Sequence, residues 1–89
     1  MTNKQLYNLG KLNSFAINID KLSRGRSTKL SICDKNGDER ILAKVTCDTV
    51  GQFPRKFTVR SASGFLPEGC GYTYKRIMSN LFSNISLTD

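Results

Sequence analysis

The fold is decided by residues 28–47, TKLSICDKNGDERILAKVTC, in which two alternating runs flank the dipeptide Asn36-Gly37. Asn-Gly is the preferred sequence of a two-residue type I′ turn, because both residues tolerate positive φ. Such a turn pairs Lys35 with Asp38 and sets the register of the strands, with Ile32 opposite Ile41, Leu30 opposite Ala43 and Thr28 opposite Val45. The apolar residues then share one face, as a half-buried hairpin requires. The stretch therefore predicts an antiparallel hairpin.

Two further segments alternate in the same way and predict strands on either side of the hairpin. Residues 14–20 place Phe15, Ile17 and Ile19 on one face, and residues 55–61 direct Phe57 and Val59 inward. The glycines between residues 64 and 71 indicate an irregular connection after the last strand. Four antiparallel strands in chain order form a meander.

Helices are expected at both ends of the chain. Thr2 followed by Gln5 is typical of a capping box and predicts a short helix over residues 3–9 that ends at Gly10. Near the other end, an apolar stripe at helical spacing consists of Tyr74, Ile77, Met78, Leu81, Phe82 and Ile85. We therefore predict an α+β fold: a four-stranded antiparallel meander with a C-terminal helix packed on one face and a short N-terminal helix.

The length of 89 residues predicts a single small domain over residues 1–89, in which residues 1–12 could form a loosely attached N-terminal helix. A core of this size leaves little room for a deep, water-excluding cleft, so an enzyme is not expected. The chain has no His, which excludes Ser-His-Asp and Cys-His arrangements. Three widely spaced cysteines fit neither a disulfide framework nor a zinc site. We expect no catalytic residues, no cofactor and no metal.

The charge balance favours an anionic partner. Lys and Arg number 14 against 7 Asp and Glu, which gives a net charge of +7 at pH 7. The alternative is that the excess charge only keeps a small protein soluble. No stretch approaches the roughly 18 apolar residues that a membrane span requires, and the first residues do not resemble a secretory signal. We therefore expect a cytoplasmic protein without a membrane partner.

The predicted register also places cations on the face opposite the apolar one. That face carries Lys29, Arg40, Lys44, Lys56 and Arg60, with no acid among them. Lys29 stands directly opposite Lys44, a like-charge pair that destabilises a hairpin by about 0.2–1 kcal/mol. A bound anion would offset this cost, although long Lys side chains can also separate into water. The face is the first candidate binding surface.

Further candidate cations lie outside the sheet. One group surrounds Gly25 in the loop after residue 20, where glycine would keep the backbone adaptable, and another occupies the first turn of the C-terminal helix. With Arg55 at the start of a strand, the full set of predicted partner-binding residues is Lys21, Arg24, Arg26, Lys29, Arg40, Lys44, Arg55, Lys56, Arg60, Lys75 and Arg76.

These features predict a non-enzymatic binding protein whose basic sheet face engages nucleic acid or a nucleoprotein complex, mainly through phosphates, because few aromatic residues are available for stacking. No small-molecule substrate is evident. The alternative is a small phage-type inhibitor of, for example, a host-defence or transcription complex, which would act in the host cytoplasm by protein–protein binding and occlusion. Leu42, Phe53 and Phe65 would then be its anchors. A third alternative is an assembly subunit that is stable only with its partner.

Overall fold

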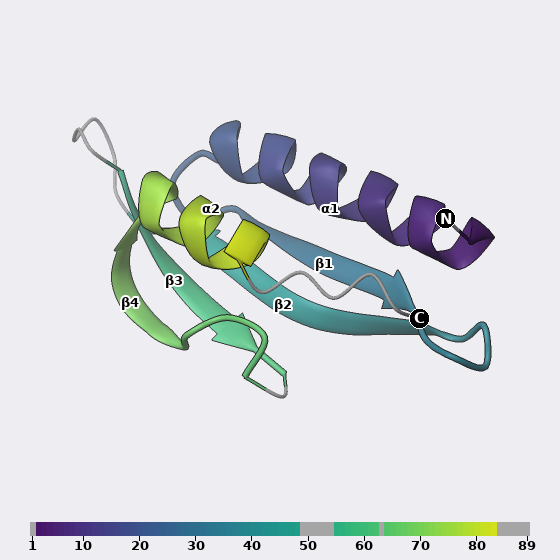
Figure 1. The fold of residues 1–89 in the computed structure, drawn as a ribbon. Coiled ribbons are helices and arrows are strands. Elements are labelled where there is room, and N and C mark those ends of the chain that lie inside the picture. Colours follow the sequence, from purple (N-terminus) through teal and green to yellow (C-terminus); the bar gives the residue numbers. More distant parts are fainter. Residues whose placement is uncertain (1, 49–54, 63, 84–89) are drawn as a thin grey trace.

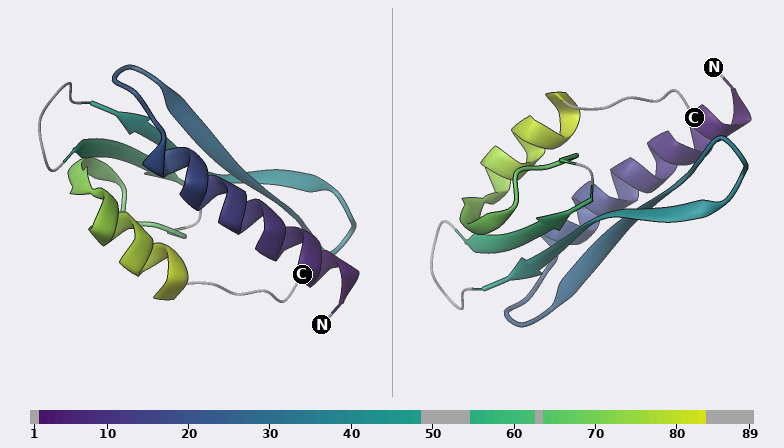
Figure 2. Two further views of the ribbon diagram at one scale, coloured as in Figure 1. Left: turned by 90° about the horizontal axis from the view of Figure 1, so that it is seen from above. Right: turned by 90° about the horizontal axis from the view of Figure 1, so that it is seen from below.

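A computed structural model describes residues 2–48, 55–62 and 64–83. The elements are α1 (Asn3–Asp20), β1 (Ser27–Cys33), β2 (Glu39–Cys47), β3 (Lys56–Ser61), β4 (Gly69–Thr73) and α2 (Tyr74–Ser83). The strands form one antiparallel sheet in the order β1-β2-β3-β4, and both helices lie on the same side of it (Figures 1 and 2). The predicted α+β fold, with a four-stranded antiparallel meander and two terminal helices, is confirmed.

The helix α1 begins as predicted but is more than twice as long, with 18 residues. The Thr2 side chain accepts a hydrogen bond from the Gln5 backbone N–H, and the Gln5 side chain accepts one from the Thr2 N–H. The helix then continues through Gly10 to Asp20, so the strand predicted over residues 14–20 was wrong. Alternation was misleading there because Phe15 and Ile19 also lie four residues apart, on one face of a helix. Ile17, which alternation placed with them, is 55% exposed.

The fourth strand of the sheet is β4, in the segment predicted to be an irregular connection. It pairs antiparallel with β3, with Phe57 opposite Tyr72 and Lys56 opposite Thr73. Its sequence, Gly-Cys-Gly-Tyr-Thr, carries two glycines, which have low strand propensity, among five residues. The meander is therefore real, but it starts after α1 and uses this segment as its last strand.

The hairpin between β1 and β2 has a three-residue loop and not the predicted two-residue turn. The Asp34 N–H donates to the Asp38 carbonyl (2.9 Å), the Gly37 N–H donates to the Asp34 carbonyl (3.1 Å), and Gly37 has a φ of 86°. The Asp34 carboxylate also accepts hydrogen bonds from the backbone N–H groups of Asn36 and Asp38, each at 2.9 Å. This loop shifts the pairing near the turn by one residue, so that Ile32 lies opposite Arg40.

A β-bulge restores the predicted register in the rest of the hairpin. The register shifts between Leu30 and Ser31, after which Leu30 lies opposite Ala43 and Thr28 opposite Val45, as predicted. The extra residue is Leu42, and both Leu42 and Ala43 are buried. A bulge opposes two residues to one, and here it brings two consecutive side chains into the core. Ile41, predicted to be in the core, is instead 55% exposed.

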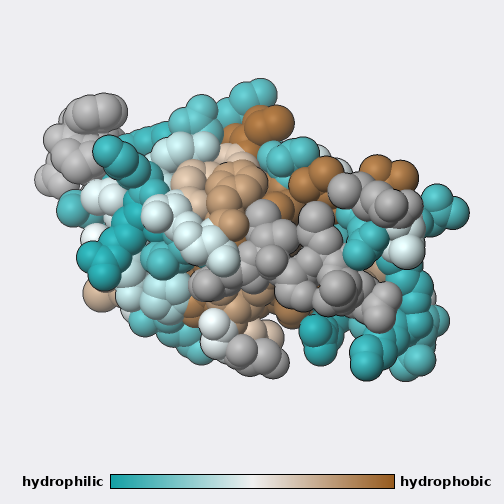
Figure 3. All heavy atoms as spheres, in the orientation of Figure 1, coloured by the Kyte–Doolittle hydropathy of each residue, from teal (hydrophilic) through white to brown (hydrophobic). Residues whose placement is uncertain are grey.

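The core fills the space between the sheet and the two helices. Its buried residues are Leu12, Phe15, Ile19, Leu30, Leu42, Ala43, Val45, Cys47, Phe57, Val59, Leu66, Ile77 and Leu81. Of the predicted C-terminal stripe, Phe82 is 50% exposed and Ile85 lies outside the described residues. Exposed apolar side chains lie on α1, β2 and α2, where Leu6, Ile17 and Ile41 are each 55% exposed and Phe82 is 50% exposed. Hydrophobic patches are visible along α1 in Figure 3.

Polar side chains fasten α1 to the edge of the sheet at β1. Asn8, only 3% exposed, donates to the Cys33 carbonyl (3.3 Å) and accepts from the Cys33 N–H (2.8 Å). Beside it, Tyr7 donates to the Glu39 carboxylate (3.0 Å), and the Lys11 ammonium lies 3.8 Å from the same group. The backbone groups of Cys33 at this edge are therefore satisfied by the helix.

Candidate functional site

Three cations stand in one line across the sheet. Lys29 on β1 lies directly opposite Lys44 on β2, and Lys44 lies directly opposite Arg60 on β3. All three side chains are exposed. Adjacent strands are about 4.8 Å apart, so the line extends roughly 10 Å across the three strands. We call Lys29, Lys44 and Arg60 the cation row.

The cation row lies on the face of the sheet that no helix covers. Successive residues of a strand point to opposite faces, and the neighbours Leu30, Val45 and Val59 are buried beneath the helices. Seen from below, this open face lies in front of the helices (Figure 2, right). The row therefore points to solvent from the most regular part of the sheet.

No acidic partner neutralises the row within the described part of the chain. The ion pairs found among residues 2–48, 55–62 and 64–83 are Lys11–Glu39 and Arg55–Asp20. Like charges in directly opposite positions are destabilising, by about 0.2–1 kcal/mol for a pair. The predicted Lys29–Lys44 pair is present, and Arg60 adds a third like charge to it.

A line of hydroxyl groups runs parallel to the cation row, two residues further along each strand. Ser27 lies opposite Thr46, and Thr46 lies opposite Thr58. The open face is not free of acids, because the Thr58 hydroxyl donates to the Asp48 carboxylate just after β2. Lys56 lies two residues before Thr58 in β3 and, by alternation, on the same face. Hydroxyl and cationic side chains together make this face a surface of hydrogen-bond donors.

Two residues predicted to be exposed on this face, Leu42 and Arg40, lie elsewhere because of the bulge and the longer loop. Leu42 is 6% exposed and lies in the core. Arg40 pairs with Ile32, whose side chain packs against the core, so Arg40 is exposed at the margin of the helix-covered side. The prediction failed at these positions because a two-residue turn was assumed.

The basic loop is fixed in place. The Gly25 N–H donates to the Cys47 carbonyl (2.9 Å), and the Cys47 N–H donates to the Arg26 carbonyl (3.0 Å). Gly25 has a φ of 78°, at the third position of the turn that the Arg26 N–H closes on the Ser23 carbonyl. The loop is thus attached to the end of β2, and its Arg24 and Arg26 are exposed. Lys21, also exposed, ends α1.

The structure uses Arg55 within its own fold. Its guanidinium donates to the carbonyls of Leu22 (2.7 Å) and Asp20 (2.5 Å) and lies 3.6 Å from the Asp20 carboxylate. These carbonyls lie at and just after the C-terminal end of α1, where a helix leaves acceptors unpaired. Arg55 therefore stabilises the end of α1.

At the start of α2, Lys75 and Arg76 are exposed and lie apart from the cation row. The Arg76 N–H donates to the Thr73 hydroxyl (3.3 Å), and the Arg76 guanidinium lies 5.5 Å from the centre of the Tyr72 ring. Gly69, Cys70 and Gly71, a few residues before Lys75, lie in β4, where Gly69 pairs with Val59 of β3.

A shallow hollow, wide open to solvent and about 310 Å³ in volume, adjoins the cation row on the β2–β3 side. Its lining includes Lys44 and Arg60 from the row, the exposed Ile41, the buried Leu42 and Ala43, and Glu68. The sequence did not reveal this hollow, because it depends on the bulge that exposes Ile41 and on the path of the loop before β4.

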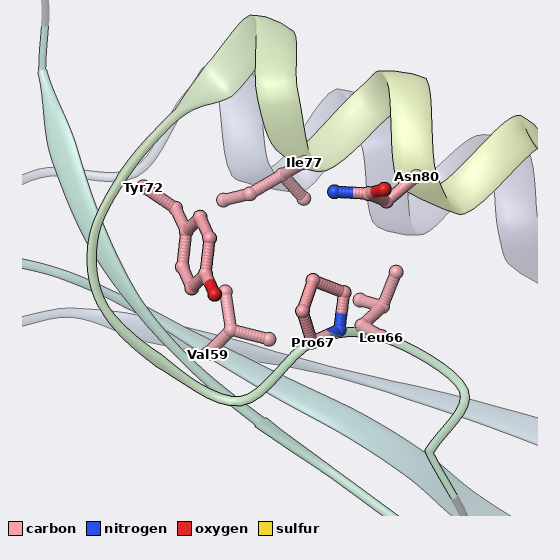
Figure 4. A pocket seen from close by; sticks show the side chains of 6 residues that line it. All are labelled: Val59, Leu66, Pro67, Tyr72, Ile77 and Asn80. Carbon is pink, nitrogen blue, oxygen red and sulfur yellow. The ribbon is translucent and has the colours of Figure 1, made fainter.

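A second space lies beneath α2 and is part of the packing (Figure 4). Side chains from β3, β4, α2 and the loop before β4 enclose it, namely Val59, Leu66, Pro67, Tyr72, Ile77 and Asn80. It measures about 160 Å³ in total and is too narrow to admit water. It offers no room for a ligand.

The described residues show neither a metal site nor a membrane-spanning helix. No group of three His, Cys, Asp or Glu side chains lies close enough to hold a metal ion in the described ranges. No described helix is long and apolar enough to cross a membrane. No protein family, curated protein or solved structure matches this chain. The open face of the sheet is therefore the candidate site on the basis of its exposed cations and hydroxyl groups alone.

Proposed function

We propose that the protein is a non-enzymatic binding protein that holds nucleic-acid phosphates, free or within a nucleoprotein complex, on the open face of its sheet. The observation that supports this most strongly is the cation row, in which three like charges stand in direct cross-strand register and form no ion pair with the described residues. The free protein bears the resulting repulsion, and phosphates would relieve it. The proposal requires no cofactor, and it places the protein in the cytoplasm with its target.

The hydroxyl line favours phosphate over the carboxylates of an acidic protein surface. Ser and Thr hydroxyls contact phosphate oxygens in many nucleic-acid complexes, beside Lys and Arg. Here Ser27 and Thr46 run parallel to the cation row, and Thr58 continues the line although its hydroxyl donates to Asp48. Two lines of donors side by side suit a backbone that presents phosphate oxygens at regular intervals.

The inhibitor alternative loses two of its three expected anchors. Leu42 is buried, and Phe65 is half-buried against the core. Phe53 lies outside the described residues. An inhibitor would bind through the same cations or through other exposed apolar residues such as Leu6, Ile17 and Phe82, and a binding experiment separates the two functions.

The test is to measure binding of labelled single-stranded DNA, duplex DNA and RNA over a series of salt concentrations. Each phosphate contact contributes about 0.9 to the slope of log K against log salt on duplex DNA, and about 0.7 on single strands. The substitution Lys44→Thr, at the centre of the row, should weaken binding and reduce that slope by about one contact. The matched control is Lys35→Thr, which removes the same charge from the exposed hairpin loop.

Equal losses from Lys44→Thr and Lys35→Thr would mean that only the net charge matters and would contradict a defined site. Failure to bind any nucleic acid above about 50 mM salt, where non-specific contacts weaken, would overturn the proposed function. Capture of a protein target through the same cations would then favour the inhibitor.

A further inference from the structure

The hollow beside the cation row combines three kinds of surface within a small space. Lys44 and Arg60 contribute positive charge, Ile41 contributes an exposed apolar side chain, and Glu68 contributes one carboxylate. Its volume of about 310 Å³ is at the lower end of the range for small-ligand sites. A ligand that complements it carries an anionic group, a flat apolar body and a hydrogen-bond donor.

Glu68 is the least expected member of this group. It is exposed and makes no hydrogen bond or ion pair with other residues of the described ranges, although Lys44 and Arg60 line the same hollow. A carboxylate repels phosphate, so a surface that bound phosphate alone would gain nothing from it. A carboxylate does accept hydrogen bonds from amino groups, and this is how Glu recognises the N4 amino group of cytosine.

We propose that the hollow receives a nucleobase with an exocyclic amino group, with cytosine preferred over thymine, from a single strand whose phosphates lie on the cation row. The phosphates meet Lys44 and Arg60, the base lies against Ile41, and its amino group donates to Glu68. Thymine presents a carbonyl oxygen where cytosine has the amino group, so the Glu68 carboxylate repels it. This inference rests on the proposed function and adds a base preference to it.

A single strand fits this site better than a duplex. The hollow lies on one face of the sheet, beside two strands, so a base must leave its stack to enter it. Bases of single strands can turn outward and be recognised on their hydrogen-bonding edges, whereas those of a duplex are paired. The phosphate contacts supply affinity for any strand, and the hollow supplies the discrimination.

The experiment compares oligodeoxycytidine and oligothymidine of equal length, which carry the same number of phosphates. The wild-type protein should bind the cytosine strand about five to ten times more tightly, near the lower limit of the discrimination that one base contact provides. Glu68→Gln should abolish this preference, because an amide both donates and accepts and can therefore pair with either base. The matched control is Asp38→Asn, which changes the net charge equally in the hairpin loop and should keep the preference.

The outcomes separate this inference from the proposed function. Equal, salt-dependent binding of both strands by the wild-type protein would overturn the base site and leave the phosphate site intact. A cytosine preference that survives Glu68→Gln would overturn the role of the hollow. If neither strand binds, the proposed function fails and the base site fails with it. Lys44→Thr should weaken binding of both strands while any remaining preference for cytosine persists.

Discussion

The edge of the sheet beneath α1 and the open face of the sheet use polar side chains in opposite ways. At the edge, Asn8 satisfies both backbone groups of Cys33, and before β3, Arg55 satisfies two carbonyls at the end of α1. On the open face, the cations of the row stand opposite one another without an acidic partner among the described residues. The fold gains stability from the first arrangement and loses stability through the second. Substitutions in the two regions should therefore change stability with opposite signs.

The largest effect is expected from Asn8→Ala, which would leave the N–H and carbonyl of Cys33 without partners at a buried position. Each unsatisfied buried group costs about 1–3 kcal/mol, so we expect the free energy of unfolding to fall by about 2–4 kcal/mol. Urea denaturation followed by circular dichroism measures this change. Asn13→Ala, at an exposed position of the same helix, is the control and should change stability by less than about 0.5 kcal/mol.

A small loss for Asn8→Ala would mean that water reaches the edge of β1 and that α1 is not fastened there. In the folded protein, this substitution should leave nucleic-acid affinity unchanged, because Asn8 lies on the opposite side of the molecule from the cation row.

A smaller loss is expected from Arg55→Met, which keeps the apolar stem and removes the guanidinium. Hydrogen bonds to charged groups contribute about 1.5–3 kcal/mol when protected. Arg55 is only partly buried, so we expect a loss of about 1–2 kcal/mol in the same denaturation experiment. The control is Arg24→Met in the neighbouring loop, where the arginine is exposed. If both variants lose the same stability, the contacts of Arg55 with α1 carry no special weight.

The sign should reverse on the open face. Lys44→Thr removes the central charge of the row and introduces a residue with higher strand propensity. We expect the free energy of unfolding to rise by about 0.2–1 kcal/mol while nucleic-acid binding weakens. Lys35→Thr in the hairpin loop should change neither property appreciably. A destabilised Lys44→Thr variant would show that the row is not under strain, and it would remove the main argument for an anionic partner.

The cation row could be predicted from the sequence even though the turn was assigned incorrectly. The three-residue loop shifts the register by one residue, and the bulge at Leu42 shifts it back before Lys29 and Lys44 meet. Both irregularities depend on tertiary packing, which brings Leu42 and Ala43 into the core together. Between the turn and the bulge the prediction therefore failed, and Arg40 and Ile41 exchanged faces.

The remaining errors have a common physical cause, which is that local patterns of short segments are ambiguous. The spacing of Phe15, Ile17 and Ile19 fits a strand, yet Phe15 and Ile19 equally fit one face of a helix, and only the rest of the fold selects between them. The glycines of β4 gave no strand signal, because pairing with β3 and not propensity creates that strand. The hollow beside Glu68 depends on the bulge that exposes Ile41 and on the path of the loop before β4, so the sequence could not predict it.

The smallest effect concerns Glu39, at the margin where the hairpin meets α1. Hydrogen bonds from Ser31 (2.6 Å) and Tyr7 (3.0 Å), together with the charge of Lys11, lower the pKa of Glu39 below its ordinary value of 4.5. A lowered pKa in the folded state adds stability when the pH is above the unfolded pKa, and this stability is lost as the pH falls through the folded value. The effect is small because the carboxylate is exposed and its interactions are screened by solvent.

Glu39→Gln should therefore reduce stability slightly at neutral pH, and this difference should shrink as the pH falls through the lowered pKa of the wild-type carboxylate. The measurement is the urea midpoint of both proteins across this pH range, with Glu68→Gln as a control that removes a carboxylate without such contacts. A gap between Glu39→Gln and wild type that persists at low pH would assign the contribution of Glu39 to packing and not to its charge. A gap that closes would place Glu39 with Asn8 and Arg55, among the polar groups that the fold itself satisfies.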